Sequence, residues 1–161
     1  MDNLNKHIAI YKEQLNRGDI VIAYNALVKF VMKLRVDLSK KHQNLYTFST
    51  ILHGYMDYTY FYYSNDFLKS KQLKFGLVLN HLHMQFELWL LGNTISVQKQ
   101  YWQLLKATKW GVDKPVMPKY AILEVTLVET PDFNNLNVLA EQITTRMTNV
   151  SSEILDNIKT L

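Results

Sequence analysis

Two carboxylates interrupt aromatic, apolar stretches of this sequence. Asp57 lies in GYMDYTYFYY, residues 54–63, and Glu87 lies in LVLNHLHMQFELWL, residues 77–90. A carboxylate on a covered sheet face is costly unless it is paired or used. If both side chains lie on one face with a strand between them, they stand about 10 Å apart and leave room for a bound molecule. Asp57 and Glu87 could then act as acid and base, although one solvated sheet face also accommodates them, and we favour that interpretation.

The histidines and cysteines limit the metal chemistry. There is no cysteine, which excludes disulfides, thiolate metal sites and thiol nucleophiles. Of the five histidines, only His81 and His83 lie close to a further ligand, Glu87. Glu87 is several residues along the strand and is not expected to reach a metal at the turn. We therefore expect no metal site and no cofactor.

Residues 77–90 could form one helix or a hairpin of two strands. A helix places His83 and Glu87 on one face but scatters the apolar side chains over several faces. Two strands alternate cleanly on either side of a turn near residues 81–84. The predicted cross-strand pairs are Leu79 with Phe86, Leu77 with Leu88, Phe75 with Leu90, and Gly76 with Trp89. In this register His81 and His83 lie at the tip, and Glu87 and Trp89 share the other face, with space beside the indole at Gly76.

Tyrosines dominate residues 54–63, which we predict to be a strand, because aromatic side chains favour a pleated sheet. With Trp89 they could form a stacking platform for a planar ligand. No glycine-rich phosphate loop, nucleophile elbow or RNA-binding signature accompanies them. Tyrosines that fill a sheet–helix interface, with their hydroxyls at its edge, are the interpretation we favour.

Helical periodicity appears at both ends of the chain. Leu4, Ile8, Tyr11 and Leu15 form an apolar stripe, and Gly18 ends that helix. A second helix follows over residues 20–38; its two apolar stripes indicate a central, buried helix that forms a hairpin with the first. Asn93 or Thr94 should cap a helix over residues 95–105, residues 109–119 should form a loop, and residues 121–129 a strand. A closing helix is predicted to start at residues 131–132.

These elements predict one α+β domain over residues 1–161, in the order α-α-β-β-β-α-β-α. The chain has 161 residues, 48% of them hydrophobic, which suits a single domain with a buried core. We expect an antiparallel sheet of about four strands, packed against the N-terminal helical hairpin and the long C-terminal helix.

Several short segments resemble a family of small bacterial proteins of unknown function. They are GYMDYTYF (54–61), LK (73–74), FELWLLG (86–92), QKQYW (98–102) and PDF (131–133). The resemblance runs from the first predicted helix to the last. Members of the family usually carry asparagine at the position of Thr94. The resemblance supports the order of the segments and implies no activity.

Charge and hydropathy narrow the class of partner. The net charge is +4, with eight Lys or Arg against four Asp or Glu in residues 1–50, and three against six in residues 119–161. The N-terminal lysines occupy the polar side of an amphipathic helix. Nucleic-acid binding through the basic N-terminal half of the chain is therefore the weakest of our hypotheses. The first 19 residues are amphipathic and lack the long apolar region of a signal peptide, and no window offers about 20 uncharged apolar residues for a membrane span. We expect a cytoplasmic protein that does not bind membranes.

We predict a non-enzymatic binding or interaction protein that forms a homodimer. Its recognition surface would be the sheet face that carries Asp57, Tyr60, Glu87 and Trp89. At least one of these side chains should be covered by another chain or by a ligand. The alternative is a small-molecule enzyme that uses Asp57 and Glu87 as acid and base.

Overall fold

An antiparallel sheet with the strand order β1-β2-β3-β4-β5 forms the centre of the protein. The computed structural model describes residues 3–161. The strands are β1 (Thr47–Phe48), β2 (Tyr58–Ser64), β3 (Leu73–Asn80), β4 (Gln85–Gly92) and β5 (Leu123–Val128). The α+β class is confirmed, with five strands where about four were expected. The additional strand, β1, has only two residues, which is too short for a periodic pattern to reveal it.

The register of the β3–β4 hairpin agrees with the prediction at each expected pair. Leu77 lies opposite Leu88, and Gly76 lies opposite Trp89. The pairs Phe75 with Leu90 and Leu79 with Phe86 are also present. A shift of one residue would turn every apolar side chain to the opposite face, so the burial pattern holds this register strongly.

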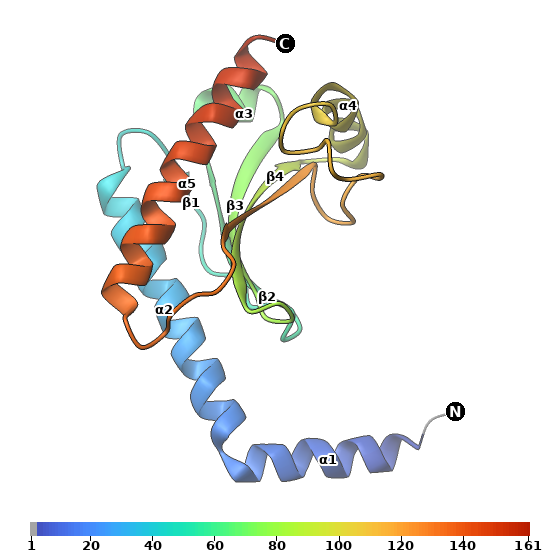
Figure 1. Cartoon of the computed structure of the whole chain (residues 1–161), viewed down its shortest axis with the longest axis vertical. Coiled ribbons are helices and arrows are strands. Elements are labelled where there is room, and N and C mark those ends of the chain that lie inside the picture. Colours follow the sequence, from blue (N-terminus) through green and yellow to red (C-terminus); the bar gives the residue numbers. More distant parts are fainter. Residues whose placement is uncertain (1–2) are drawn as a thin grey trace.

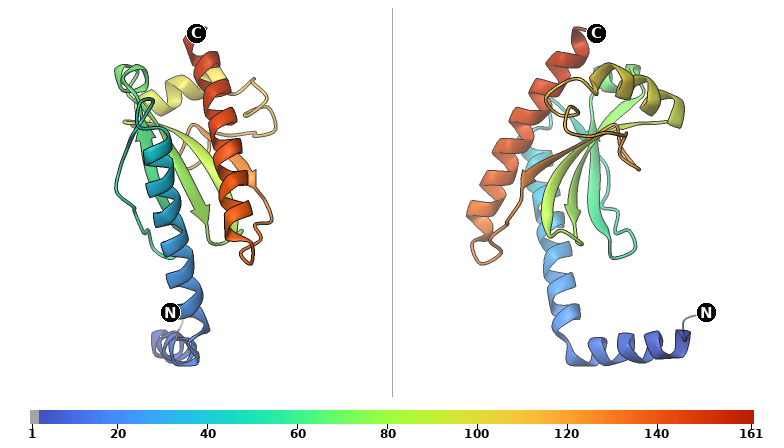
Figure 2. Two further views of the ribbon diagram at one scale, coloured as in Figure 1. Left: turned by 90° about the vertical axis from the view of Figure 1, so that its left-hand side faces the viewer. Right: turned by 45° about the vertical axis from the view of Figure 1, so that its right-hand side comes forward.

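Two long helices cover one face of the sheet, called here the inner face. They are α2 (Asp19–Lys41) and α5 (Leu136–Lys159), and they run along the same side of the strands (Figures 1 and 2). Leu34 and Leu38 of α2 and Ile143 and Met147 of α5 are buried in one cluster with the inner face. The strands contribute to this main core with Phe61, Phe75, Leu77, Leu79, Phe86, Leu88 and Leu90.

The opposite face of the sheet, called here the outer face, is partly covered by the segment that joins α4 to β5. The helix α4 (Ile95–Leu105) begins at the predicted cap, because the side chain of Thr94 accepts a hydrogen bond from the Val97 N–H at 3.2 Å. Residues 106–122, called here the crossing segment, then lead to β5, and Ala121 packs against the outer face. A short helix, α3 (Asp66–Ser70), joins β2 to β3.

The first helix, α1 (Leu4–Arg17), is joined to α2 by the single residue Gly18. The expected pair of N-terminal helices is present, but the two form an L and do not fold back on each other (Figure 1). No residue of α1 is buried, and burial in α2 begins only at Phe30. The prediction that α2 would be the central, most buried helix was therefore wrong for its first half, which leaves Ile22 exposed.

Candidate functional site

Alternation along the strands sets the chemical character of the outer face. Tyr60 of β2 lies opposite Val78 of β3, which lies opposite Glu87 of β4, so these three side chains form a row across the sheet. The next row contains Tyr62, Gly76, Trp89 and Glu124. Three of the four predicted site residues, Tyr60, Glu87 and Trp89, thus share this face.

Glu87 is the centre of a hydrogen-bond network on the outer face. Its Oε1 accepts hydrogen bonds from Asn80 Nδ2 at 3.0 Å and Gln85 Nε2 at 2.6 Å, and its Oε2 accepts one from Trp89 Nε1 at 2.7 Å. Glu87 is only 5% exposed and Trp89 only 6%. None of the ion pairs found within residues 3–161 involves Glu87. Neutral donors alone therefore satisfy this buried carboxylate.

Glu124 brings a second carboxylate close to Glu87. Glu124 lies on β5, opposite Trp89 of β4. The next pair of the same face along these two strands is Thr126 with Glu87. Partial burial raises the pKa of Glu124, and the negative charge of Glu87 raises it further, while the ammonium group of Lys114 lowers it. With its raised pKa, Glu124 is the carboxylate of the outer face that can bind either a proton or a cation.

Three aromatic rings lie over this acidic region. The Tyr58 ring meets Trp89 edge-on at 5.0 Å and meets Tyr120 at 6.2 Å. Tyr120, from the crossing segment, is nearly parallel to Trp89 with ring centroids 6.5 Å apart. Burial raises the pKa of Tyr58, and the charges of Glu124 and Glu87 add to the effect. The expectation that Trp89 would be open to a partner was wrong, because Tyr58 and Tyr120 of its own chain cover it.

A second aromatic group continues along β2. Tyr60 and Tyr62 are half-buried, with ring centroids 5.4 Å apart. Lys74 Nζ lies 4.1 Å from the Tyr62 ring centroid, in a cation–π contact. Burial, and then the neighbouring Tyr60, raise the pKa of Tyr62 to about 12. The space predicted at Gly76 is filled by Tyr62 and Leu91, whose carbon atoms lie 3.5 and 3.4 Å from an added Cβ.

Asp57 does not lie on the outer face. It is exposed in the turn before β2, where its Oδ1 accepts hydrogen bonds from the backbone N–H groups of Tyr55 at 2.8 Å and Tyr58 at 2.7 Å. These bonds lower the pKa of Asp57. The predicted strand over residues 54–63 starts only at Tyr58, because residues 54–57 form the turn. Asp57 is a turn-forming residue, and the expected pair of Asp57 and Glu87 is not assembled.

The two histidines of the hairpin have different surroundings. His81 Nε2 lies 2.8 Å from the hydroxyl of buried Thr59, and its ring packs against Tyr24 at 5.6 Å. Burial lowers the pKa of His81. His83 is exposed at the turn. Within residues 3–161 no three His, Asp or Glu side chains are placed to hold a metal ion.

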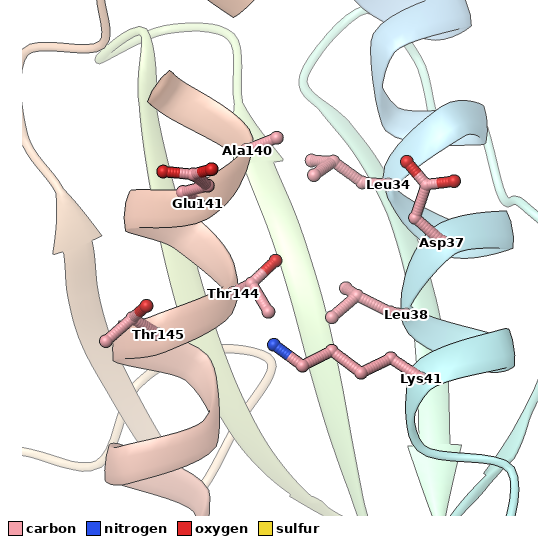
Figure 3. Close-up of a pocket in the computed structure, with 8 residues that line it drawn as sticks. All are labelled: Leu34, Asp37, Leu38, Lys41, Ala140, Glu141, Thr144 and Thr145. Carbon is pink, nitrogen blue, oxygen red and sulfur yellow. The ribbon is translucent and has the colours of Figure 1, made fainter. Parts of the chain in front are cut away.

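A pocket on the opposite side of the molecule lies between α2 and α5 (Figure 3). It has a volume of about 440 Å³ and is lined by Leu34, Asp37, Leu38, Lys41, Ala140, Glu141, Thr144 and Thr145. Asp37 is already paired with Lys33 at 2.5 Å. Figure 3 shows the Lys41 side chain extending between the helices, while Glu141 lies on the α5 side. No group of donors or acceptors converges there, so the outer face remains the stronger candidate.

Sequence reasoning missed four residues of the site. Asn80 and Gln85 form the first pair after the hairpin turn, so the predicted register already placed them beside Glu87. Tyr120 and Glu124 gave no such signal. Their positions depend on how the crossing segment returns the chain to the edge of β4, and local periodicity carries no information about that.

The chain was compared with protein families, curated proteins and solved structures. The model of the DUF7000 family, described as a domain of unknown function, matches residues 4–158. The chain belongs to this family. No curated protein and no solved structure matches. Within residues 3–161, no helix is long and apolar enough to cross a membrane.

Proposed function

We propose that the protein is a non-enzymatic binding protein whose outer face recognises a positively charged group, such as a basic side chain or an organic cation. The observation that carries this proposal is the pair of neighbouring carboxylates, Glu87 and Glu124, next to three aromatic rings. Aromatic rings that adjoin acidic groups are the usual means by which proteins bind ammonium and guanidinium groups.

The electrostatics of the two carboxylates support a cationic ligand. The three donors to Glu87 are neutral, and Lys114 only partly opposes the rise in the pKa of Glu124. A bound cation would relieve the repulsion between Glu87 and Glu124 and would lower the pKa of Glu124. Binding should therefore strengthen as Glu124 loses its proton.

The aromatic residues support the same ligand class. Lys74 lies 4.1 Å from the Tyr62 ring centroid, and Lys119 lies 5.0 Å from that of Tyr120. The exposed faces of these rings thus already attract ammonium groups of the protein itself. In this proposal Tyr58, Tyr120 and Glu124 contact the ligand, while buried Glu87 and Trp89 hold the surface in place.

A small-molecule enzyme is the second candidate, favoured by the raised pKa of Glu124. Asp57 lies in the turn, so the acid and base would be Glu124 and Glu87. Against this, three donors occupy the oxygens of Glu87, which is buried and offers little access to a substrate. The binding function therefore has the better support.

The test is a calorimetric titration of the whole chain with choline and with dimethylbutanol, the uncharged isostere of choline. We expect choline to bind about tenfold more tightly than the isostere, since the cation–π and charge interactions are lost with the positive charge. Tyr120→Ala and Glu124→Gln should weaken choline binding. Glu129→Gln, in an exposed residue just after β5, is the matched control and should not. Equal affinity for choline and its isostere, or no binding of choline, would overturn the proposal.

We also propose that the protein is a homodimer and acts in the cytoplasm. A reducing compartment suits a chain that has no cysteine. The exposed apolar side of α1 supports association with a second chain.

A further inference from the structure

The helix α1 presents an apolar stripe that the described part of the chain, residues 3–161, leaves exposed. Leu4, Ile8, Tyr11 and Leu15 are between 36% and 68% exposed, and no residue of α1 is buried. A helix of 14 residues is marginal by itself in water and usually depends on packing of its apolar side. The stripe therefore indicates a docking surface.

The link between the helices prevents α1 from covering this stripe with α2. The helix α1 ends at Arg17, α2 starts at Asp19, and Gly18 between them has the left-handed backbone conformation with φ of 87°. Antiparallel helices are joined by loops of about two to five residues. A single residue directs α1 away from the body, as Figure 2 shows. Within residues 3–161 no segment covers the stripe, so it is open to a second molecule.

The stripe continues into an apolar corner between the two helices. Tyr11 and Leu15 of α1 line this corner together with Ile20, Val21 and Tyr24 of α2 and with residues 54–56. Its volume is about 490 Å³. Tyr55, at the tip of the turn, is 96% exposed, which is unusual for so large a ring. The corner and the stripe form one continuous surface, called here the elbow.

We infer that α1 pairs antiparallel with α1 of a second copy of the chain, inside the elbow, and that this pairing forms the dimer. The inference rests on the homodimer proposed above and names its interface. The apolar positions are spaced 4-3-4, which reads the same in both directions along the helix. An antiparallel pair therefore sets Leu4 against Leu15 of the partner subunit, and Ile8 against Tyr11 of the partner subunit.

The charges beside the stripe favour a second copy of the chain over an anionic membrane as the partner of α1. The positions that flank it are Asn5 and Lys12 on one side and His7 and Gln14 on the other. Antiparallel pairing brings Lys12 beside Asn5 of the partner subunit, and no like charges meet. A helix that binds an anionic membrane is rich in lysine and arginine on the polar face beside its apolar side. Here one edge has only His7 and Gln14, so a second copy fits better.

The area buried between two subunits approaches that of a specific dimer interface when the corner residues are buried together with the α1 stripe. Burying the four apolar side chains removes roughly 300–400 Å² from each α1, or about 700 Å² for the pair. Specific interfaces need about 1,200 Å² or more. Tyr55 and Met56 at the corner are both exposed, and an aromatic side chain alone adds about 150–250 Å² when buried. Covering the corner on both subunits brings the total close to the required range.

The first experiment measures the mass of the whole chain by sedimentation equilibrium at micromolar concentration. We expect a dimer for the unchanged protein and a monomer for Ile8→Glu, which places a charge in the middle of the stripe. Lys6→Glu, on the far side of the same helix, is the matched control and should remain dimeric. Because α1 contributes no buried residue, the circular dichroism and melting temperature of the monomeric variant should report an intact body.

The second experiment fixes the orientation by cross-linking, and the absence of natural cysteine gives it a clean background. We expect a disulfide between one chain with Ile8→Cys and another with Tyr11→Cys when the two are mixed and oxidised. Leu4→Cys alone should not cross-link, since antiparallel pairing leaves its two copies about 16 Å apart along the helix.

The outcomes separate the two levels of the proposal. A monomer at all concentrations would overturn both the homodimer and the α1 pairing. A dimer that survives Ile8→Glu, or one that cross-links Leu4→Cys to itself, would leave the homodimer standing and overturn the antiparallel pairing. Loss of the dimer in Ile8→Glu together with the mixed disulfide would support both.

Discussion

The indole N–H of Trp89 donates a hydrogen bond to the carboxylate of Glu87, two residues earlier on the same strand, at 2.7 Å. The pair belongs to one face of β4, as the alternation of the sequence predicted. It is buried beneath Tyr58 and Tyr120, and not displayed on an open surface. Glu87 and Trp89 therefore support the outer face from beneath, and the residues above them are left to meet a ligand.

Replacing the carboxylate should disturb this network. In Glu87→Gln one acceptor oxygen becomes a donor, and Asn80 cannot turn to accept from it, because its Oδ1 already accepts from the His83 N–H at 3.2 Å. We expect a loss of about 1–3 kcal/mol in the free energy of unfolding, measured with urea, as is typical for an unsatisfied buried polar group. Glu129→Gln, in an exposed position, should change stability by no more than about 0.5 kcal/mol. Equal stability of the two variants would show that the network does not contribute to folding.

A charge at the centre of the hairpin tests the register. Leu88 is fully buried opposite Leu77. Leu88→Asp should therefore lower the free energy of unfolding by several kcal/mol and leave little folded protein at room temperature. Leu82→Asp makes the same chemical change in the exposed turn of the same hairpin and should be nearly neutral. Thermal unfolding followed by circular dichroism compares the two, and a stable Leu88→Asp protein would contradict the packing described here.

This hairpin was readable from the sequence because local rules all agreed there. Alternation, apolar pairing and the turn near residues 81–84 point to one register, and a shift by one residue would invert every side chain. The path of α1 was not predicted, although the sequence does place Gly18 alone between two helical patterns. Both helices were expected to bury apolar stripes, but the single residue Gly18 is too short a link to fold α1 back onto α2.

The site was predicted less well, since it depends on contacts between distant segments. Asp57 was assigned to a strand because aromatic residues surround it, yet Gly54 and Met56 both adopt positive φ and make this segment a turn. Tyr120 belongs to the crossing segment, which has two prolines and no periodicity, and Glu124 lies on β5, whose alternation does not reveal which strand it pairs with. Their position over β4 follows from tertiary packing, which no local pattern encodes.

The hairpin should also give the protein a pH dependence. Burial lowers the pKa of His81 below its ordinary value, so the unfolded chain binds a proton more readily than the folded one. This contribution to stability is present at neutral pH and is lost as the pH falls through the ordinary histidine range, between about pH 7 and pH 5. His81→Gln can still bond the hydroxyl of Thr59 but cannot be charged, so its urea midpoint should fall less over this range. His83→Gln, at the exposed turn, is the control and should follow the unchanged protein.

Glu124 should make the stability depend on pH in the opposite direction to His81. Burial and the charge of Glu87 raise its pKa, so the folded state holds the proton more tightly than the unfolded chain. Stability is therefore lost as the pH rises through the raised pKa. At neutral pH, Glu124→Gln should make the protein more stable, by less than about 1 kcal/mol because the side chain is partly exposed and screened. A residue retained for binding at a cost in stability should behave in this way, since substitutions that stabilise a site commonly weaken its function. Urea unfolding of Glu124→Gln, alongside its choline titration, checks both effects. A variant that loses stability and still binds choline would show that Glu124 is a structural residue.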